Sequence, residues 1–236
     1  IIIAENTCFY GESGGQVGDT GTIKSKNGEF LVKDTKKTPQ GIFIHFGKLI
    51  SGSINVGEDV DISIDEERRS LIMKNHSATH LLHAALRNTL GNHVAQRGSL
   101  VNSEKLRFDF SHNKQISRDD INKIQDEVNS VIKTSSKSNI EIKSQEDAIK
   151  AGAIALFGEK YGDEVRVVTL GSKNDNPYSI ELCGGTHVKD VTEISKFLII
   201  NEESVSSGVR RIEALTFKKV DEYLSLRSKE KEKLEI

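Results

Sequence analysis

Apolar residues recur with helical spacing around a histidine-rich stretch between residues 66 and 90 of this 236-residue chain. Residues four apart return to one face of an α-helix, so His76 and His80 point the same way about one turn apart. His83 and Arg87 follow on that side, whereas the opposite side carries Leu71, Ala78, Leu82 and Ala85. The pattern predicts a helix that packs one face and presents a histidine stripe from the other.

The first 65 residues have the texture of short strands. Alternation of apolar with other residues is typical of half-buried strands, and it occurs in two runs: Ile42, Ile44 and Phe46, then Val60, Ile62 and Ile64. Asn27-Gly28 separates two β-rich runs and predicts a tight hairpin turn with positive φ angles. Short strands with glycine punctuation favour a small barrel or sandwich.

Two further helices are predicted after the histidine stretch, because Ser117 and Ser144 each precede a helical pattern and can cap its first turn. Strands are expected at residues 106–110, 165–170, 178–182, 196–201 and within 205–217. Runs of strands with separate helices favour an α+β fold over a strictly alternating βαβ array. Beyond Phe217, Lys, Glu, Ser and Leu dominate, which predicts a charged helix or linker.

These patterns divide the chain into three expected parts: a β-rich, barrel-like subdomain (1–65), an α+β core (66–216) and a charged helix or linker (217–236). Hydrophobic residues make up 36% and charged residues 29%, which is the profile of a soluble globular protein. The longest apolar runs are only a few residues long, so neither a transmembrane helix nor a secretory signal is expected. The chain begins Ile1-Ile2-Ile3 without Met, so we expect a piece of a longer protein.

The cysteine content and the net charge bear on the redox compartment and on the binding partners of the chain. Cys8 and Cys183 can form at most one disulfide, so a reducing cytoplasm is favoured, and we expect Cys8 to be a small buried thiol. The formal net charge of -2 argues against indiscriminate nucleic-acid binding but is compatible with a local basic surface.

A second pair of metal-binding residue types follows a predicted strand. Cys183 and His187 lie four residues apart, and two glycines between them permit a sharp turn. With His76 and His80 they make three imidazoles and one thiolate, a donor set that suits Zn²⁺. A single histidine is more often a structural side chain, but the paired pattern favours a metal site. A closed four-ligand site would be structural, whereas a catalytic zinc keeps one position open, and both interpretations stand here.

Two neighbouring signals bear on the chemistry. A zincin-type metalloprotease requires Glu directly after the first histidine, and Ser77 occupies that place, which argues against a peptidase. Glu181 precedes Cys183 by two residues and can orient water, although an ordinary strand carboxylate is the simpler interpretation. The glycine-rich residues 9–19 form either a bare turn or a backbone that approaches a ligand closely.

With these two pairs of possible metal ligands, the chain resembles the editing domain of alanyl-tRNA synthetase. It is also similar to free-standing AlaX-type trans-editing proteins. The resemblance covers most of the chain and rests on five ordered motifs: residues 9–16 (FYGESGGQ), 75–82 (NHSATHLL), 106–110 (LRFDF), 181–187 (ELCGGTH) and 208–213 (GVRRIE). The charged helix and residues 106–110 look more like a piece of a synthetase than like AlaX. ATP binding and aminoacylation would then belong to the remaining synthetase domains.

The resemblance implies hydrolysis of tRNA(Ala) mischarged with serine or glycine, in a site between the β-rich part and a zinc-containing editing core. It implies that Zn²⁺ is bound by His76, His80, Cys183 and His187. It further implies that Gln16 and Thr79 belong to the substrate pocket, so with Cys183 they are the expected catalytic residues. A polar pocket of this kind can select serine, because the serine hydroxyl finds hydrogen bonds that alanine cannot make.

Contacts to tRNA phosphates are expected from Arg210 and Arg211, and further from Arg97 and Lys74. Two alternatives remain beside the editing function of a synthetase. One is a non-catalytic RNA-binding module in which zinc serves only folding. The other is a free-standing AlaX-type deacylase.

Overall fold

The N-terminal part of the computed structural model, which describes residues 1–155 and 162–234, is an open antiparallel sheet. Its strand order is β3-β2-β1-β4, with β1 Gly21–Lys24, β2 Gly28–Lys37, β3 Phe43–Gly52 and β4 Asp61–Ile64. The predicted barrel is wrong, because β3 and β4 lie at opposite edges of this sheet and do not pair with each other. A small cluster around Phe9, Ile23, Phe30 and Val32 covers one face.

The predicted hairpin joins β1 and β2, but its expected backbone geometry is wrong. Neither Asn27 nor Gly28 has a positive φ angle. Gly28 is required for a different reason: a Cβ there would lie 2.5 Å from the carbonyl oxygen of Ser53. The glycine therefore permits close approach of the chain that leaves β3.

Helix α1 (Glu66–Leu90) has the predicted bounds and carries the site. Asp65 caps its first turn by accepting a hydrogen bond from the Arg68 amide, and Gly91 follows its last residue. Every residue from Lys74 to His83 is buried, so the histidine stripe on the second face of the helix is enclosed within the molecule. One side of α1 packs on an apolar cluster, and the histidine side is covered by other parts of the chain.

Two more antiparallel sheets and two helices complete the core, as expected for an α+β fold. One sheet has the order β10-β11-β6-β5, and the other has the order β7-β8-β9. The strands are β5 Gln96–Val101, β6 Leu106–Ser111, β7 Asn139–Ser144, β8 Glu164–Lys173, β9 Asn176–Leu182, β10 Phe197–Ser206 and β11 Val209–Thr216. Ser117 caps α2 (Arg118–Lys133) and Ser144 caps α3 (Gln145–Lys150), as predicted. A short 3-10 helix, η1, spans Val191–Ile194.

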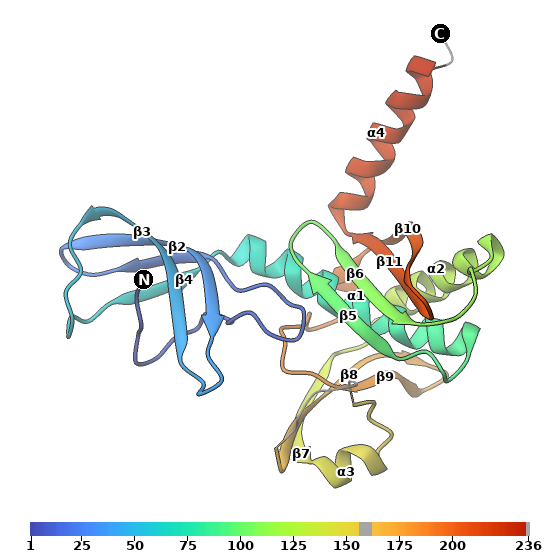
Figure 1. Ribbon diagram of the computed structural model, residues 1–236, viewed down its shortest axis with the longest axis horizontal. Coiled ribbons are helices and arrows are strands. Elements are labelled where there is room, and N and C mark those ends of the chain that lie inside the picture. Colours follow the sequence, from blue (N-terminus) through green and yellow to red (C-terminus); the bar gives the residue numbers. More distant parts are fainter. Residues whose placement is uncertain (156–161, 235–236) are drawn as a thin grey trace.

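Figure 1 shows the N-terminal sheet at one end of the molecule, with α1 running from it into the core. Helix α4 (Lys218–Leu234) is the predicted charged helix and projects away from the core; residues 235–236 of the predicted segment lie outside the described residues. No helix in the described part of the chain is long and apolar enough to cross a membrane. Cys8 is exposed, so the expected burial of this thiol is wrong.

Candidate metal centre

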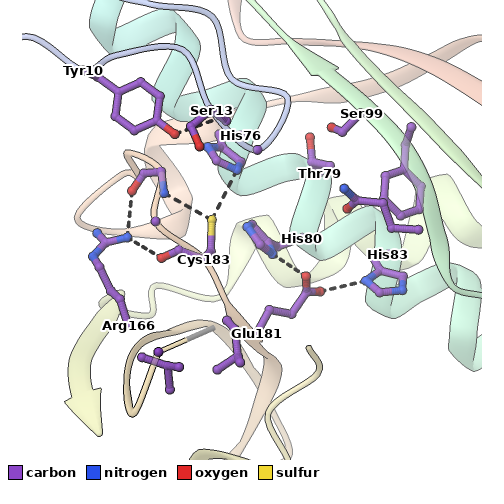
Figure 2. Close-up of a pocket in the computed structure, with 18 of the residues that line it drawn as sticks. Tyr10, Ser13, His76, Thr79, His80, His83, Ser99, Arg166, Glu181 and Cys183 are labelled. Carbon is purple, nitrogen blue, oxygen red and sulfur yellow. Dashed lines mark hydrogen bonds and ion pairs between the residues drawn. The ribbon is translucent and has the colours of Figure 1, made fainter. Parts of the chain in front are cut away.

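Four side chains predicted as ligands meet at one place in the core. His76, His80, Cys183 and His187 each offer one ligand atom, and these atoms lie within 4.8 Å of one another. Cys183 Sγ is 3.5 Å from His76 Nε2 and 3.3 Å from His187 Nε2. The two histidines of α1 thus face the turn that follows β9 (Figure 2). The structure brings together residues separated by more than 100 positions in the sequence.

His76 is held by a residue of the glycine-rich segment. Its Nδ1 lies 2.7 Å from the side-chain oxygen of Gln16. The Gln16 oxygen also accepts from the Thr186 backbone amide at 2.9 Å, and its NH₂ group donates to Thr186 Oγ1 at 2.9 Å. Because an amide oxygen only accepts, His76 carries its proton on Nδ1 and presents the Nε2 lone pair to Cys183.

His80 and His83 share one buried carboxylate. Glu181 Oε2 is 2.7 Å from His80 Nδ1, and Glu181 Oε1 is 3.0 Å from His83 Nδ1 (Figure 2). Ser179 donates a further hydrogen bond to Oε1. Because Nδ1 of His80 faces Glu181, its ligand atom is Nε2. Glu181, which the sequence left between a water-orienting group and an ordinary strand carboxylate, therefore orients a histidine of the cluster.

The third imidazole is oriented in a similar way. His187 Nδ1 lies 3.2 Å from Ser77 Oγ, which also accepts from the Val188 backbone amide at 3.1 Å. Ser77, which argues against a protease, is therefore also a partner of His187. All three imidazoles have an oxygen partner at Nδ1, which is the arrangement that fixes the tautomer and direction of metal-binding histidines.

Electrostatics favour an ionised thiol in this cluster. Burial alone would raise the pKa of Cys183, but the neighbouring His76 and His80 hold it well below its usual value. Burial alone would lower the pKa of His80, yet the charges of Glu181 and Cys183 raise it to about 10. Burial and the nearby His76 lower the pKa of His187 to about 3. A thiolate and a neutral imidazole are the forms that bind metal, whereas His80 must first release a proton.

A cavity of about 270 Å³ opens beside the cluster. Its walls come from the glycine-rich segment, α1, β5, β6, β8 and the turn after β9, and its polar lining includes Tyr10, Ser13, Thr79, His83, Ser99 and Arg166 (Figure 2). Thr79 Oγ1 donates its proton to the Asn75 carbonyl at 2.8 Å, so towards a ligand this oxygen can only accept. The cavity is large enough to hold a small ligand next to the cluster.

Gln16 does not line this cavity in the described structure, although the resemblance implies a pocket residue. Its side chain is fully buried and engaged with His76 and Thr186. The glycine-rich segment holds it there by pairing with β5: the Val17 amide donates to the Val101 carbonyl, and the Val101 amide donates to the Gly15 carbonyl. The placement makes Gln16 a partner of a ligand rather than a wall of the pocket.

Glycine is required where this segment touches β5. Gly15 has φ +85°, and a Cβ there would lie 2.7 Å from the Ser99 carbonyl oxygen. A buried ion pair between Asp19 and Arg69 anchors the end of the segment to α1. The segment is therefore a docked wall of the site, not a bare turn.

The four basic residues expected at tRNA are not placed together at the cavity. Arg97 is exposed on β5. Arg210 pairs with Glu202, and Arg211 makes a two-pronged ion pair with Asp109 at 2.7 and 2.9 Å. Lys74 is only 8% exposed and donates to Ser70 Oγ at 2.6 Å, so its burial argues against the predicted phosphate contact.

Sequence reasoning placed His83 beside the histidine pair without a role, and it did not identify Ser77 and Arg166 as parts of the site. Ser77 and His83 lie on α1 at helical spacing from the ligands, which is a usable signal. Arg166 lies 17 residues before Cys183 on another strand. No local pattern points to it, because only the pairing of β8 with β9 brings it to the turn.

Comparisons with known proteins point to tRNA synthetases. Residues 1–68 match the family of class II (A) tRNA synthetases, and residues 165–213 match the second additional domain of threonyl and alanyl tRNA synthetases. The chain is 50% identical over 228 residues to the alanine–tRNA ligase of Chelativorans sp. strain BNC1, covering 94% of this chain and 26% of that protein.

Two further alanine–tRNA ligases are 49% identical to the chain. That of Mesorhizobium japonicum aligns over 91% of this chain and 25% of its own length, and that of Rhizobium johnstonii over 95% and 26%. The chain thus spans about a quarter of the length of these relatives. The predicted resemblance to the editing region is confirmed.

Proposed function

We propose that this chain, which is related to about a quarter of alanine–tRNA ligase, is the proofreading part of such an enzyme. It hydrolyses the ester that joins serine or glycine to tRNA(Ala). The observation that carries the proposal is the cavity of about 270 Å³ lined by His76, His80 and Cys183, three of the four residues whose ligand atoms converge. A small acyl group can be held there against a metal ion.

The donor set fits Zn²⁺. Zinc prefers four nitrogen and sulfur ligands at about 2.0–2.3 Å, which places neighbouring ligand atoms roughly 3.3–3.8 Å apart. The distances of 3.3 and 3.5 Å from Cys183 Sγ to two imidazole nitrogens agree with this spacing. His80 Nε2 is buried without a hydrogen bond, which is unfavourable unless another group, such as a metal ion, compensates it. His76, His80, Cys183 and His187 would hold the ion.

When bound, zinc would polarise the ester carbonyl or lower the pKa of a water molecule to about 7. The chain's own residues prepare the site for that chemistry. Gln16, Ser77 and Glu181 hold the three imidazoles, and the docked glycine-rich segment covers one side of the cavity. Ester hydrolysis needs the acyl carbon held in a fixed place, and these partners supply a rigid surround.

Specificity for serine follows from Thr79. Its Oγ1 already donates to the Asn75 carbonyl, so it accepts a hydrogen bond from the serine hydroxyl, which alanine lacks. A synthetic pocket sized for alanine excludes glycine poorly by size and rejects the added hydroxyl of serine only weakly. A second, hydrolytic site therefore complements it.

Contact with tRNA is proposed along the exposed side of β5 and the ends of β10 and β11. Arg97 is exposed there, and Arg210 and Arg211 would exchange their carboxylate partners for phosphates. The remaining synthetase domains would supply aminoacylation. Within the chain we propose a β-rich part (1–65), a catalytic core (66–216) and a charged connecting helix (217–236).

One observation favours a second function. Four protein ligands complete a tetrahedral zinc site, and such closed sites are usually structural. In that case the chain is a zinc-stabilised RNA-binding module without hydrolytic activity.

A deacylation assay separates the two functions. The purified chain is incubated with Ser-tRNA(Ala), Gly-tRNA(Ala) and Ala-tRNA(Ala), each with and without a chelator. The editing function predicts rapid loss of the serine and glycine esters, slow loss of the alanine ester, and inhibition by chelator. Zinc and tRNA binding without ester hydrolysis would instead establish the non-catalytic module. Hydrolysis by the chain alone cannot tell a synthetase piece from a free-standing deacylase, but the relatives matched over nearly the whole chain are alanine–tRNA ligases.

A further inference from the structure

We infer that Arg166 is a positioning residue that clamps the Cys183–Gly185 turn and so directs Cys183 Sγ towards the three imidazoles. The inference rests on the proposed function only in taking this turn as a carrier of metal ligands. Arg166 Nη1 donates to the Cys183 carbonyl at 2.7 Å and to the Gly185 carbonyl at 2.8 Å. Figure 2 shows both bonds reaching the turn from the side opposite α1.

Gln16 holds the end of the turn through Thr186, but the turn is open at Gly184. A Cβ on Gly184 would meet nothing within 4 Å, so no neighbour packs against that side. A Cβ on Gly185 would lie 2.0 Å from His76 Cε1, so glycine is required there. Two successive glycines leave the backbone free to adopt many conformations. A clamp that bridges the carbonyls on both sides of Gly184 removes that freedom.

Backbone and side chain of Arg166 act on the same residue. The Cys183 amide donates to the Arg166 carbonyl at 3.0 Å, which continues the pairing of β8 with β9 by one step. The guanidinium then fixes the peptide that follows. Together they leave Cys183 Sγ at 3.5 and 3.3 Å from His76 Nε2 and His187 Nε2. Metal affinity is sensitive to this placement, because partners that orient ligands typically contribute about 10–100-fold.

The effect of Arg166 is geometric. Within residues 1–155 and 162–234 it forms no ion pair with a carboxylate, and its bonds go to carbonyl oxygens. A planar guanidinium keeps two carbonyls in a fixed relation, whereas a lysine ammonium is a single point of charge on a flexible stem. Lysine therefore retains the charge but loses the clamp.

Arg87 provides a matched control. Its Nη1 donates to the carbonyls of Asn92 and Val94 at 3.1 and 2.9 Å, so it clamps the loop after α1 in the same manner. It lies seven residues beyond His80, roughly 10 Å along the helix, and does not line the cavity. Loss of this clamp affects a loop without metal ligands.

The test compares R166K and R166M with R87K and the unchanged chain. Zinc affinity is measured by competition with a chromogenic chelator, and Co²⁺ is used as a spectroscopic probe of the cysteine ligand. We expect zinc affinity to fall about 10–100-fold in both Arg166 variants, with a weaker thiolate-to-cobalt charge-transfer band. In R87K, zinc affinity should stay within about twofold even if the melting temperature falls.

Circular dichroism decides whether each variant is folded, and R166K serves if R166M does not fold. The inference is overturned if the folded Arg166 variants match the unchanged chain in both zinc affinity and cobalt spectrum. It is equally overturned if R87K loses as much affinity as R166K, or if the unchanged chain binds no metal. An unchanged chain that binds zinc but leaves Ser-tRNA(Ala) intact contradicts the proposed function and not the role of Arg166.

Discussion

The two buried sides of α1 are stabilised in opposite ways. One side carries Ala78, Leu82 and Ala85, which are fully buried in the main apolar cluster. The other carries His76 and His80, equally enclosed but facing polar groups. Burial of apolar area is favourable by about 25 cal/mol per Å² without any partner, whereas a buried polar group is costly unless it is hydrogen-bonded.

The difference distinguishes the residues of α1 that stabilise the fold from those that serve the metal site. Leucine and alanine need only neighbours of suitable shape, so the apolar side stabilises the helix in any state of the site. Each imidazole needs an oxygen at Nδ1 and a further partner at Nε2, and the chain supplies the first from three separate segments. A metal ion would supply the second. The comparison predicts that substitutions on the two sides have separable effects.

The largest effect should follow from Cys183→Ala. Removing the only thiolate of the cluster leaves three imidazoles, so bound zinc and hydrolysis of Ser-tRNA(Ala) should both fall to background. Folding without metal should persist, because the apolar side is untouched. Zinc is measured by elemental analysis and hydrolysis with radiolabelled ester. Full hydrolysis by a metal-free variant would rule out the metal mechanism.

Leu82→Ala should have the converse effect. The cavity left on the apolar side should lower the free energy of unfolding by roughly 2–5 kcal/mol. Zinc affinity of the folded variant should stay within about twofold, since no ligand or partner is removed. Denaturant unfolding measures the first quantity and chelator competition the second.

Leu226→Ala is the matched control for this change. Leu226 is 61% exposed on α4, so its truncation should alter the free energy of unfolding by less than about 0.5 kcal/mol. If Leu82→Ala abolished zinc binding in the folded state, the two sides of α1 would not be separable.

Glu181→Gln should weaken zinc about 10–100-fold while the chain remains folded. One carboxylate oxygen lies 2.7 Å from His80 Nδ1 and the other 3.0 Å from His83 Nδ1, whereas an amide offers one oxygen to the two imidazoles. Glu127→Gln is the control, because Glu127 accepts from Asn88 and Tyr178 away from the cavity. Equal loss of zinc affinity in both variants would mean that Glu181 acts only on stability.

The last expected effect is a pH dependence of zinc affinity, which is smallest when counted per pH unit. Glu181 and Cys183 raise the pKa of His80 to about 10, so near pH 7 the metal-free chain holds a proton on His80 that zinc must displace. Lower pH favours the metal-free form, and affinity should rise about tenfold per pH unit towards pH 10. Titration calorimetry in buffers of different ionisation enthalpy counts the released proton. An affinity that does not change with pH would contradict a protonated His80.

Local patterns predicted much of the fold. The 3.6-residue period gave the bounds of α1, and the capping serines marked α2 and α3, because these signals depend on residues within one turn. Whether the N-terminal sheet closes depends on which edges pair, and no local pattern records that. Strand β7 was not predicted, although Ile140 and Ile142 alternate with polar residues; both side chains are exposed, 44% and 71%.

The four ligand residues of the site could be predicted from the sequence, but the residues that orient them could not. Paired spacing pointed to His76, His80, Cys183 and His187, which the structure places together. Gln16 was noticed for its glycine-rich setting, but its contact with His76 spans 60 residues. Glu181 was noticed beside Cys183 but its two histidine partners were not, and Arg166 reaches the cluster only through the pairing of β8 with β9. Such partners follow from tertiary structure alone.

The central claim is that the polar side of α1 and the turn after β9 hold one metal ion. X-ray absorption spectroscopy of the chain loaded with one equivalent of Zn²⁺ tests it most directly. The account predicts three nitrogen scatterers at about 2.0–2.1 Å and one sulfur at about 2.3 Å. A zinc environment without sulfur would contradict it.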